Sequence, residues 1–165
     1  MENEKKKILI VEDDIDVITV MKTIFTKEGY EIESAMSKKE ALNKLENNKF
    51  DIAILDVMMT NRYEGFELAQ EIKNNPELKG MPILIQSSID VLITSKSAVR
   101  EMAVQYRQDP NYKDLQVLLV KSATDGSAGI DYLDEAGKSH WFPVNGFIRK
   151  PVEAKKLIGE IKKHI

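Results

Sequence analysis

Three carboxylates and one lysine stand at the ends of apolar runs in this chain and could together handle a phosphoryl group. Glu12 and Asp13 follow one run, Asp56 closes a second run (FDIAILD), and Lys150 follows a third. A carboxylate can attack phosphorus if the negative charge of both groups is neutralised, which a divalent cation held by carboxylates does well. We therefore interpret Asp56 as a phosphoryl acceptor, with Glu12 and Asp13 as residues that bind the cation. Lys150 would pair with the phosphoryl oxygens as a compact point charge.

A side-chain hydroxyl at the end of an intervening strand would complete this arrangement by donating to a phosphoryl oxygen. Ser87 closes the apolar run Met81–Ser87, and Ser122 follows the similar run Leu115–Val120, so both serines are candidates. Each of these polar residues taken alone has an ordinary explanation as a helix cap, a turn residue or a solvated side chain. Their common position at the ends of apolar runs is what indicates a site.

The elements that would position these residues alternate between strands and helices. Short apolar runs typical of buried strands are Lys7–Val11, Tyr30–Ala35, Phe50–Asp56 and Met81–Ser87. Between them, apolar residues recur at helical spacing, and Ser37 followed by Glu40 has the form of a capping box. This alternation predicts a parallel sheet covered on both faces, whose ligand-binding edge lies at the carboxyl ends of the strands.

The chain after Ser88 departs from this simple alternation. Ser97–Gln108 has helical spacing, Leu115–Val120 is typical of a buried strand, and Ala123–Pro143 is rich in Gly, Asp and Ser. Val144–Arg149 is then expected to form a strand, and the remaining residues a last helix. We interpret this middle part as an extra helix, strand and loop added to one α/β domain.

Composition limits the classes of function. The 165 residues are 42% hydrophobic, which suits one globular domain, and the net charge of -3 gives no electrostatic argument for nucleic acid or an anionic membrane. The absence of cysteine excludes disulfides, thiolate metal ligands and thiol catalysis. No apolar run is long enough to span a bilayer and no signal-peptide core follows the N-terminus, so we expect a cytoplasmic protein.

As a set, these motifs resemble the receiver domain of bacterial two-component response regulators. The matching segments are Ile8–Asp14, Asp51–Met59, Glu64–Leu68, Met81–Ser88 and Phe147–Val152. The resemblance implies a flavodoxin-like, doubly wound parallel sheet with strand order 2-1-3-4-5. Residues 1–165 would then form a single receiver domain that carries an insertion at about 89–143.

The resemblance also implies how phosphorylation takes place. Asp56 would accept a phosphoryl group from the phosphohistidine of a sensor histidine kinase or a phosphotransfer protein. Mg²⁺ would be held by the carboxylates of Glu12, Asp13 and Asp56 and by the backbone carbonyl of Met58. The domain would not be an enzyme, because it catalyses only its own phosphoryl transfer and slow autodephosphorylation.

The remaining implied roles concern the response to phosphorylation. Lys150 would bind the phosphoryl oxygens, and its peptide bond to Pro151 would be cis. A hydroxyl would move toward the phosphate, and an aromatic ring, Phe147 by position, would turn inward. Ser87 is the preferred hydroxyl because an ordinary helix and turn precede it, whereas Ser122 lies beyond the extra segment.

These implications describe a stand-alone receiver that signals through protein contacts, with no output domain after its last helix. The insertion could dock an unknown downstream protein or form a homodimer, or it could simply enlarge the fold. One alternative is a degenerate receiver that acts as an interaction module and is never phosphorylated. A second alternative, a phosphohydrolase with an aspartyl nucleophile, is disfavoured because Met58 stands where such enzymes place a second acid.

Overall fold

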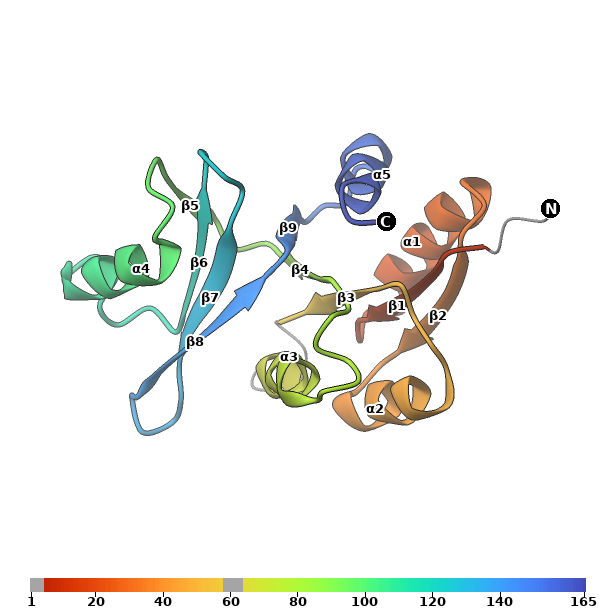
Figure 1. The fold of residues 1–165 in the computed structure, drawn as a ribbon, viewed down its shortest axis with the longest axis horizontal. Helices are drawn as coiled ribbons and strands as arrows, with labels where there is room; N and C mark the ends of the chain where they lie inside the picture. Colours follow the sequence, from red (N-terminus) through yellow and green to blue (C-terminus); the bar gives the residue numbers. More distant parts are fainter. Residues whose placement is uncertain (1–4, 58–63) are drawn as a thin grey trace. The chain divides into compact units, whose positions relative to one another are not determined.

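The structure is a computed structural model that describes residues 5–57 and 64–165. The chain divides into two compact units (Figure 1). The main unit comprises Met1–Ser87 and Ile148–Ile165, and the inserted unit comprises Ser88–Phe147. The inserted unit has nearly the bounds expected for the insertion, about 89–143. The interpretation of the chain as a single receiver domain stays a prediction.

The central sheet has five strands in the order β2-β1-β3-β4-β9. The strands are β1 (Lys7–Val11), β2 (Glu31–Ala35), β3 (Ile52–Asp56), β4 (Ile83–Ser87) and β9 (Gly146–Arg149). Strand β1 pairs in parallel with β2 and β3, and β3 pairs in parallel with β4. This order confirms the predicted flavodoxin-like sheet, with β9 in the place of the fifth strand.

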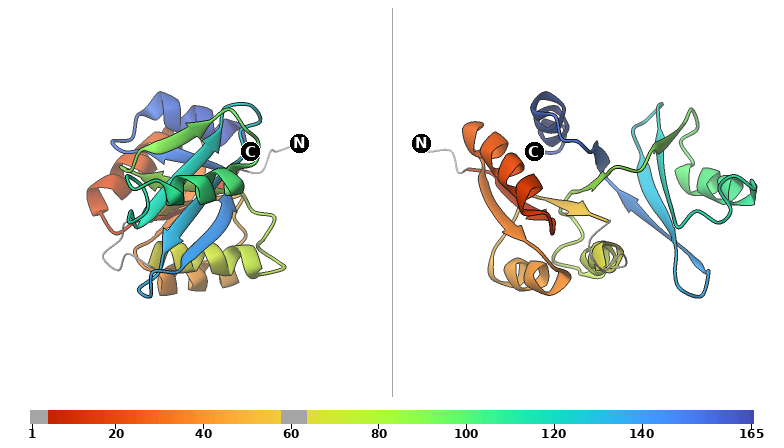
Figure 2. Two further views of the ribbon diagram at one scale, coloured as in Figure 1. Left: turned by 90° about the vertical axis from the view of Figure 1, so that its left-hand side faces the viewer. Right: turned by 180° about the vertical axis from the view of Figure 1, so that it is seen from behind.

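Four helices cover the two faces of this sheet. They are α1 (Ile15–Lys27), α2 (Lys38–Asn47), α3 (Glu64–Asn74) and α5 (Ala154–Lys162). Helices α1 and α5 lie on one face of the sheet, and α2 and α3 lie on the other (Figures 1 and 2). The Ser37 hydroxyl accepts from the backbone N–H of Glu40 at 3.1 Å, so the predicted cap begins α2.

The core of the main unit explains why its strands read as continuous apolar runs. Every residue of β3 and β4 is buried, as a strand covered on both faces requires. Beneath α1 and α5, the buried residues are Ile8, Ile10, Met21, Phe25, Ile52, Ile54, Leu84, Ile148, Leu157 and Ile161. With the strands fixed in this way, their last residues are held at the carboxyl edge of the sheet.

The inserted unit has its own sheet, with four strands in the order β5-β6-β7-β8. Its elements are β5 (Val91–Thr94), α4 (Val99–Gln108), β6 (Val117–Ser122), β7 (Ala128–Leu133) and β8 (Ser139–Val144). Strand β5 is parallel to β6, whereas β7 is antiparallel to both of its neighbours. Figure 2 shows α4 lying along this sheet, where it packs on Leu118 and Val120.

Three expectations for this region were wrong. Ala123–Pro143, expected to be a turn-rich loop, contains β7 and most of β8, and strand β5 was not expected. The expected strand Val144–Arg149 is divided, because β8 ends at Val144 and β9 begins at Gly146. Strand β7 was not predicted because it contains Gly129, and glycine weakens a strand pattern. In the structure a glycine is needed at this position, because a Cβ would overlap the Trp141 ring.

Candidate functional site

Glu12 and Asp13 lie directly after β1, at the carboxyl edge of the sheet. The backbone N–H of Glu12 donates to the Ala35 carbonyl at 3.0 Å, so the pairing of β1 with β2 continues to this residue. Oε1 of Glu12 accepts from the backbone N–H of Asp14 at 3.2 Å, and the Glu12 side chain is buried. Asp13 is only partly buried, so its carboxylate can meet water.

Asp56 is the last residue of β3 and is 1% exposed. Its backbone is closely packed by Gly65, in the first turn of α3. A Cβ on Gly65 would lie 2.6 Å from the Asp56 carbonyl oxygen, which is shorter than van der Waals contact allows. The glycine therefore lets α3 begin against the end of β3 without displacing the acceptor residue.

Lys150 reaches both buried carboxylates from the residue after β9. Its Nζ lies 3.0 Å from Oδ2 of Asp56 and 3.1 Å from Oε2 of Glu12. Its backbone N–H donates to the Ser87 carbonyl at 3.0 Å, which ties the lysine to the end of β4. The Lys150–Pro151 peptide bond is cis, which confirms the expectation for this bond. The ends of four strands thus contribute to one site.

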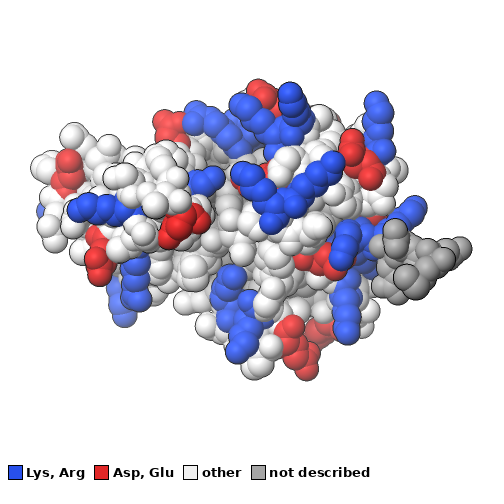
Figure 3. All heavy atoms as spheres, turned by 45° about the horizontal axis from the view of Figure 1, so that its top comes forward, with Lys and Arg blue, Asp and Glu red and all other residues white. Residues whose placement is uncertain are grey.

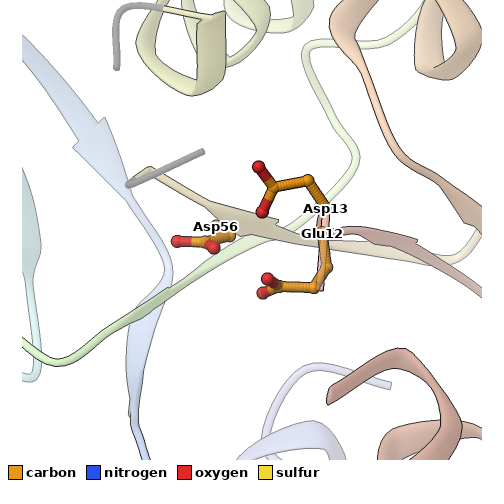
Figure 4. A group of neighbouring side chains, drawn as sticks. All are labelled: Glu12, Asp13 and Asp56. Atoms are coloured by element: carbon orange, nitrogen blue, oxygen red, sulfur yellow. The ribbon is translucent and has the colours of Figure 1, made fainter. Parts of the chain in front are cut away.

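The three acids come together at the ends of β1 and β3 (Figure 4). One carboxylate oxygen from each of Glu12, Asp13 and Asp56 lies within 4.8 Å of the others. Carboxylate oxygens are hard ligands of the kind that Mg²⁺ prefers, and Mg²⁺ commonly retains several waters. The donor set therefore fits Mg²⁺, and the partly exposed Asp13 leaves that side of the cluster open to water.

Burial and mutual repulsion change the protonation of this cluster. Burial, together with the negative charge of Asp56 and a hydrogen bond to it, raises the pKa of Glu12 from 4.5 to about 7, although Lys150 opposes the change. Burial lowers the pKa of Lys150, but its hydrogen bonds and charge interactions with Asp56 and Glu12 outweigh burial and raise it overall. Lys150 is therefore a cation at neutral pH, whereas Glu12 is close to its midpoint.

The two candidate serines lie in different units. Ser87 ends β4 and is buried in the main unit, which also contains Asp56. Ser122 ends β6 in the inserted unit, where its Oγ accepts from the backbone N–H groups of Thr124 at 3.2 Å and Asp125 at 3.4 Å. Ser122 thus caps a turn, and the choice of Ser87 as the switch hydroxyl stays a prediction.

Two other predicted residues have no role assigned by geometry. Met58, whose carbonyl was expected to bind Mg²⁺, lies outside the described residues. Phe147 lies on β9 and is half-buried, so its role as the aromatic switch stays a prediction.

Gln86 is a site residue that sequence analysis missed. Its Nε2 donates to Oε2 of Glu12 at 3.3 Å, and its side chain is fully buried. The sequence feature that could have indicated its role is polarity, because Gln86 is a single amide at the end of the apolar stretch Ile83–Ile85.

The face drawn in Figure 3 carries charges of both signs. Basic and acidic side chains are interspersed over the face in Figure 3, as expected for 24 basic and 27 acidic residues. Among the described residues, no helix has both the length and the apolar character needed to cross a membrane.

Comparison with known proteins identifies the family of this chain. The family model of the response regulator receiver domain matches residues 8–110. Among curated proteins, the transcriptional regulatory protein PhoP of Bacillus subtilis, which controls alkaline phosphatase synthesis, is 32% identical over 85 residues, covering 52% of this chain and 34% of PhoP. The response regulator SaeR of Staphylococcus aureus is 38% identical over 66 residues, covering 40% of this chain and 28% of SaeR. The chain spans about a third of the length of these relatives.

Solved structures show the same fold. The chemotaxis protein CheY4 of Vibrio cholerae has a TM-score of 0.63 at 21% identity, covering 98% of this chain and 100% of CheY4. A CheY-like receiver domain protein of Methanospirillum hungatei has a TM-score of 0.61 at 26% identity, covering 97% of this chain and 93% of that one. The chain belongs to the response regulator receiver domain family of two-component systems.

Proposed function

We propose that this chain is a phosphorylated receiver, in which Asp56 accepts a phosphoryl group in a Mg²⁺-dependent reaction. The observation that carries the proposal is the placement of Lys150, whose Nζ contacts the buried carboxylates of both Asp56 and Glu12. A buried carboxylate held beside an ammonium group and two further acids is equipped to receive a phosphoryl group and neutralise its charge.

In the proposed reaction, an Asp56 carboxylate oxygen forms the new bond to phosphorus. The donor is the phosphohistidine of a sensor histidine kinase or a phosphotransfer protein. Its P–N bond breaks as the P–O bond forms, and the imidazole retains the electron pair. Mg²⁺, held by Glu12, Asp13 and Asp56 with the Met58 carbonyl, would neutralise charge on the phosphoryl oxygens. Hydrolysis of the acyl phosphate by water then restores the carboxylate.

The proposed response begins with a change of partner for Lys150. In the unphosphorylated protein its ammonium group forms ion pairs with Asp56 and Glu12. A phosphoryl group on Asp56 would attract it more strongly than a carboxylate, because the phosphoryl group carries more negative charge. The backbone N–H of Lys150 donates to the carbonyl of Ser87, the residue that carries the proposed switch hydroxyl. The switch roles of Ser87 and Phe147, and signalling through a downstream protein, are the parts of the proposal that rest on the resemblance to receiver domains.

The test is phosphorylation by acetyl phosphate and Mg²⁺, read by intact mass. The wild-type protein should gain one phosphoryl group, and should not gain it when EDTA removes the metal. Asp56→Asn should gain none and keep its circular dichroism spectrum. A wild-type protein with no adduct would favour the degenerate receiver, and steady turnover of small phosphomonoesters would favour a phosphohydrolase.

A further inference from the structure

Gln86 is a buried amide in a strand that is otherwise apolar. Residues Ile83–Ile85 precede it on β4, and all of them are fully buried, as is Gln86. Burial of an amide costs roughly 1–3 kcal/mol unless its hydrogen bonds are replaced. An apolar side chain would therefore suit this position better if packing alone determined the residue.

The amide of Gln86 belongs to the acidic cluster. Gln86 is the register partner of Asp56 across the parallel pair β3 and β4, so their side chains leave the sheet on the same face. Its Nε2 donates at 3.3 Å to Oε2 of Glu12, the oxygen that also contacts Lys150 at 3.1 Å. Oε2 of Glu12 is thus held by one neutral donor and one cation, while its Oε1 accepts from the backbone N–H of Asp14.

The other end of the amide has no partner among the described residues, although it is buried. Oε1 of Gln86 accepts no hydrogen bond there. Reversing the amide would place its oxygen against the Glu12 carboxylate, so the observed orientation is the one that electrostatics favours. A buried acceptor without a donor is costly, which indicates that a donor from outside the described chain completes the site.

We propose that Gln86 is a positioning residue for the cation site, which holds the Glu12 carboxylate in place and offers its amide oxygen to a water that accompanies Mg²⁺. The hydration shell of Mg²⁺ supplies such donors, because this ion gives up its waters reluctantly. When Lys150 turns to the phosphoryl group, Gln86 remains as the donor to Oε2 of Glu12. This inference rests on the proposed function, since it assumes that the acidic cluster holds Mg²⁺.

The test compares Mg²⁺ binding with stability in the absence of a phosphoryl donor. Gln86→Met keeps the length of the side chain but removes its hydrogen bonds, and Gln86→Leu is a second apolar replacement. Isothermal titration with Mg²⁺ should show about 10- to 100-fold weaker binding for both variants, as for other residues that orient metal ligands. Their metal-free melting temperatures should equal or exceed that of the wild type. Leu84→Met, a similar change on the same strand within the hydrophobic core, should keep wild-type affinity.

The outcomes separate this inference from the function on which it rests. A wild-type protein that binds no Mg²⁺ would refute the proposed function. A wild-type protein that binds Mg²⁺ while both Gln86 variants bind it equally well would refute the positioning role alone. A loss of affinity that parallels a loss of metal-free stability in both variants would show that Gln86 is merely structural.

Discussion

The ammonium group of Lys150 lies 3.0 Å from Oδ2 of Asp56, although 94 positions separate the two residues in the chain. The same ammonium group lies 3.1 Å from Oε2 of Glu12. One cation therefore holds together two carboxylates whose side chains are only 1–2% exposed. In the metal-free protein, Lys150 offsets the repulsion that these carboxylates would otherwise experience.

Replacing Lys150 by alanine should destabilise the metal-free protein and uncouple metal binding from the response. Removal of one partner from a buried ion pair typically costs about 3–5 kcal/mol, and the loss should be larger at pH 8 than at pH 6, where Glu12 can take up a proton. The variant should still bind Mg²⁺, but beryllofluoride, a phosphoryl mimic, should no longer change its NMR spectrum. A normal spectral response would show that the assigned role of Lys150 is wrong.

A matched control for this variant is Lys156→Ala. Lys156 pairs with Glu153 at 3.4 Å, but the two side chains are 80% and 61% exposed. Such exposed pairs contribute between about 0 and 1 kcal/mol, so denaturant unfolding should detect little change.

The raised pKa of Glu12 predicts a pH dependence of both stability and metal binding. Because its pKa rises from 4.5 to about 7 on folding, the folded protein retains a proton that the unfolded chain has released between these values. The contribution of Glu12 to the free energy of unfolding therefore falls as pH rises through this window, by about 3 kcal/mol. Since Mg²⁺ must displace this proton, Mg²⁺ affinity should increase between about pH 6 and pH 8.

Denaturant unfolding of the metal-free protein at several pH values measures this effect. Glu12→Gln, which cannot ionise, should flatten the pH profile between about pH 5 and pH 8 and be the more stable protein at pH 8. Identical pH profiles for the variant and the wild type would contradict the assigned pKa shift.

Gly65→Ala should disturb Asp56 even though Gly65 carries no functional group. The added Cβ would lie 2.6 Å from the Asp56 carbonyl oxygen and 2.9 Å from Cα of Val57, and neither backbone atom can move freely. We expect a loss of about 1–3 kcal/mol in stability and slower formation of the phospho-adduct. Gly159→Ala in α5 is the control, because its Cβ would meet no atom within 4 Å, and this variant should be stabilised by about 0.5–1 kcal/mol.

The inserted unit depends on a buried ion pair between Arg107 and Asp131. Nε of Arg107 lies 2.8 Å from Oδ1 of Asp131, with side chains 11% and 6% exposed. The guanidinium also donates to the carbonyls of Tyr112, Leu115 and Asp131, which ties α4 and the following turn to β7. Arg107→Ala should therefore destabilise this unit by about 3–5 kcal/mol.

Hydrogen exchange of amides in β6 and β7 measures this loss within the inserted unit. The double variant Arg107→Met/Asp131→Leu should recover much of the stability, because it leaves no buried charge unpaired. Unchanged exchange in Arg107→Ala would show that the pair contributes little.

The strands of the main unit could be predicted because they are buried on both faces and each is recognisable from a short stretch of sequence. Continuous apolar runs are the pattern of strands covered on two faces, and the acids of the site directly follow such runs. The capping box at Ser37 is also a local signal, and the structure contains it. For these reasons, the strands and the meeting of Glu12 with Asp56 at their carboxyl ends could be anticipated, whereas the strand order came from the resemblance to receiver domains.

The inserted unit could not be predicted in the same way, because distant contacts determine it. In β7, Gly129 makes room for Trp141 of the neighbouring strand, and Asp131 is the partner of Arg107 from α4. Both residues are poor strand formers by local propensity, and they are present because of their tertiary contacts, so propensity does not predict this strand. Gln86 was not predicted to be a site residue for a related reason, because its partner Glu12 lies 74 positions away in the sequence.

Chemical trapping identifies the residue that carries the phosphoryl group, which we propose is Asp56. Borohydride delivers hydride to the acyl carbon of an aspartyl phosphate, so the side chain becomes an alcohol, phosphate leaves and the residue becomes homoserine. After treatment with acetyl phosphate and Mg²⁺, peptide mass spectrometry of the reduced wild-type protein should find homoserine at position 56. Homoserine at another aspartate, with Asp56 unmodified, would show that Asp56 is not the phosphoryl acceptor.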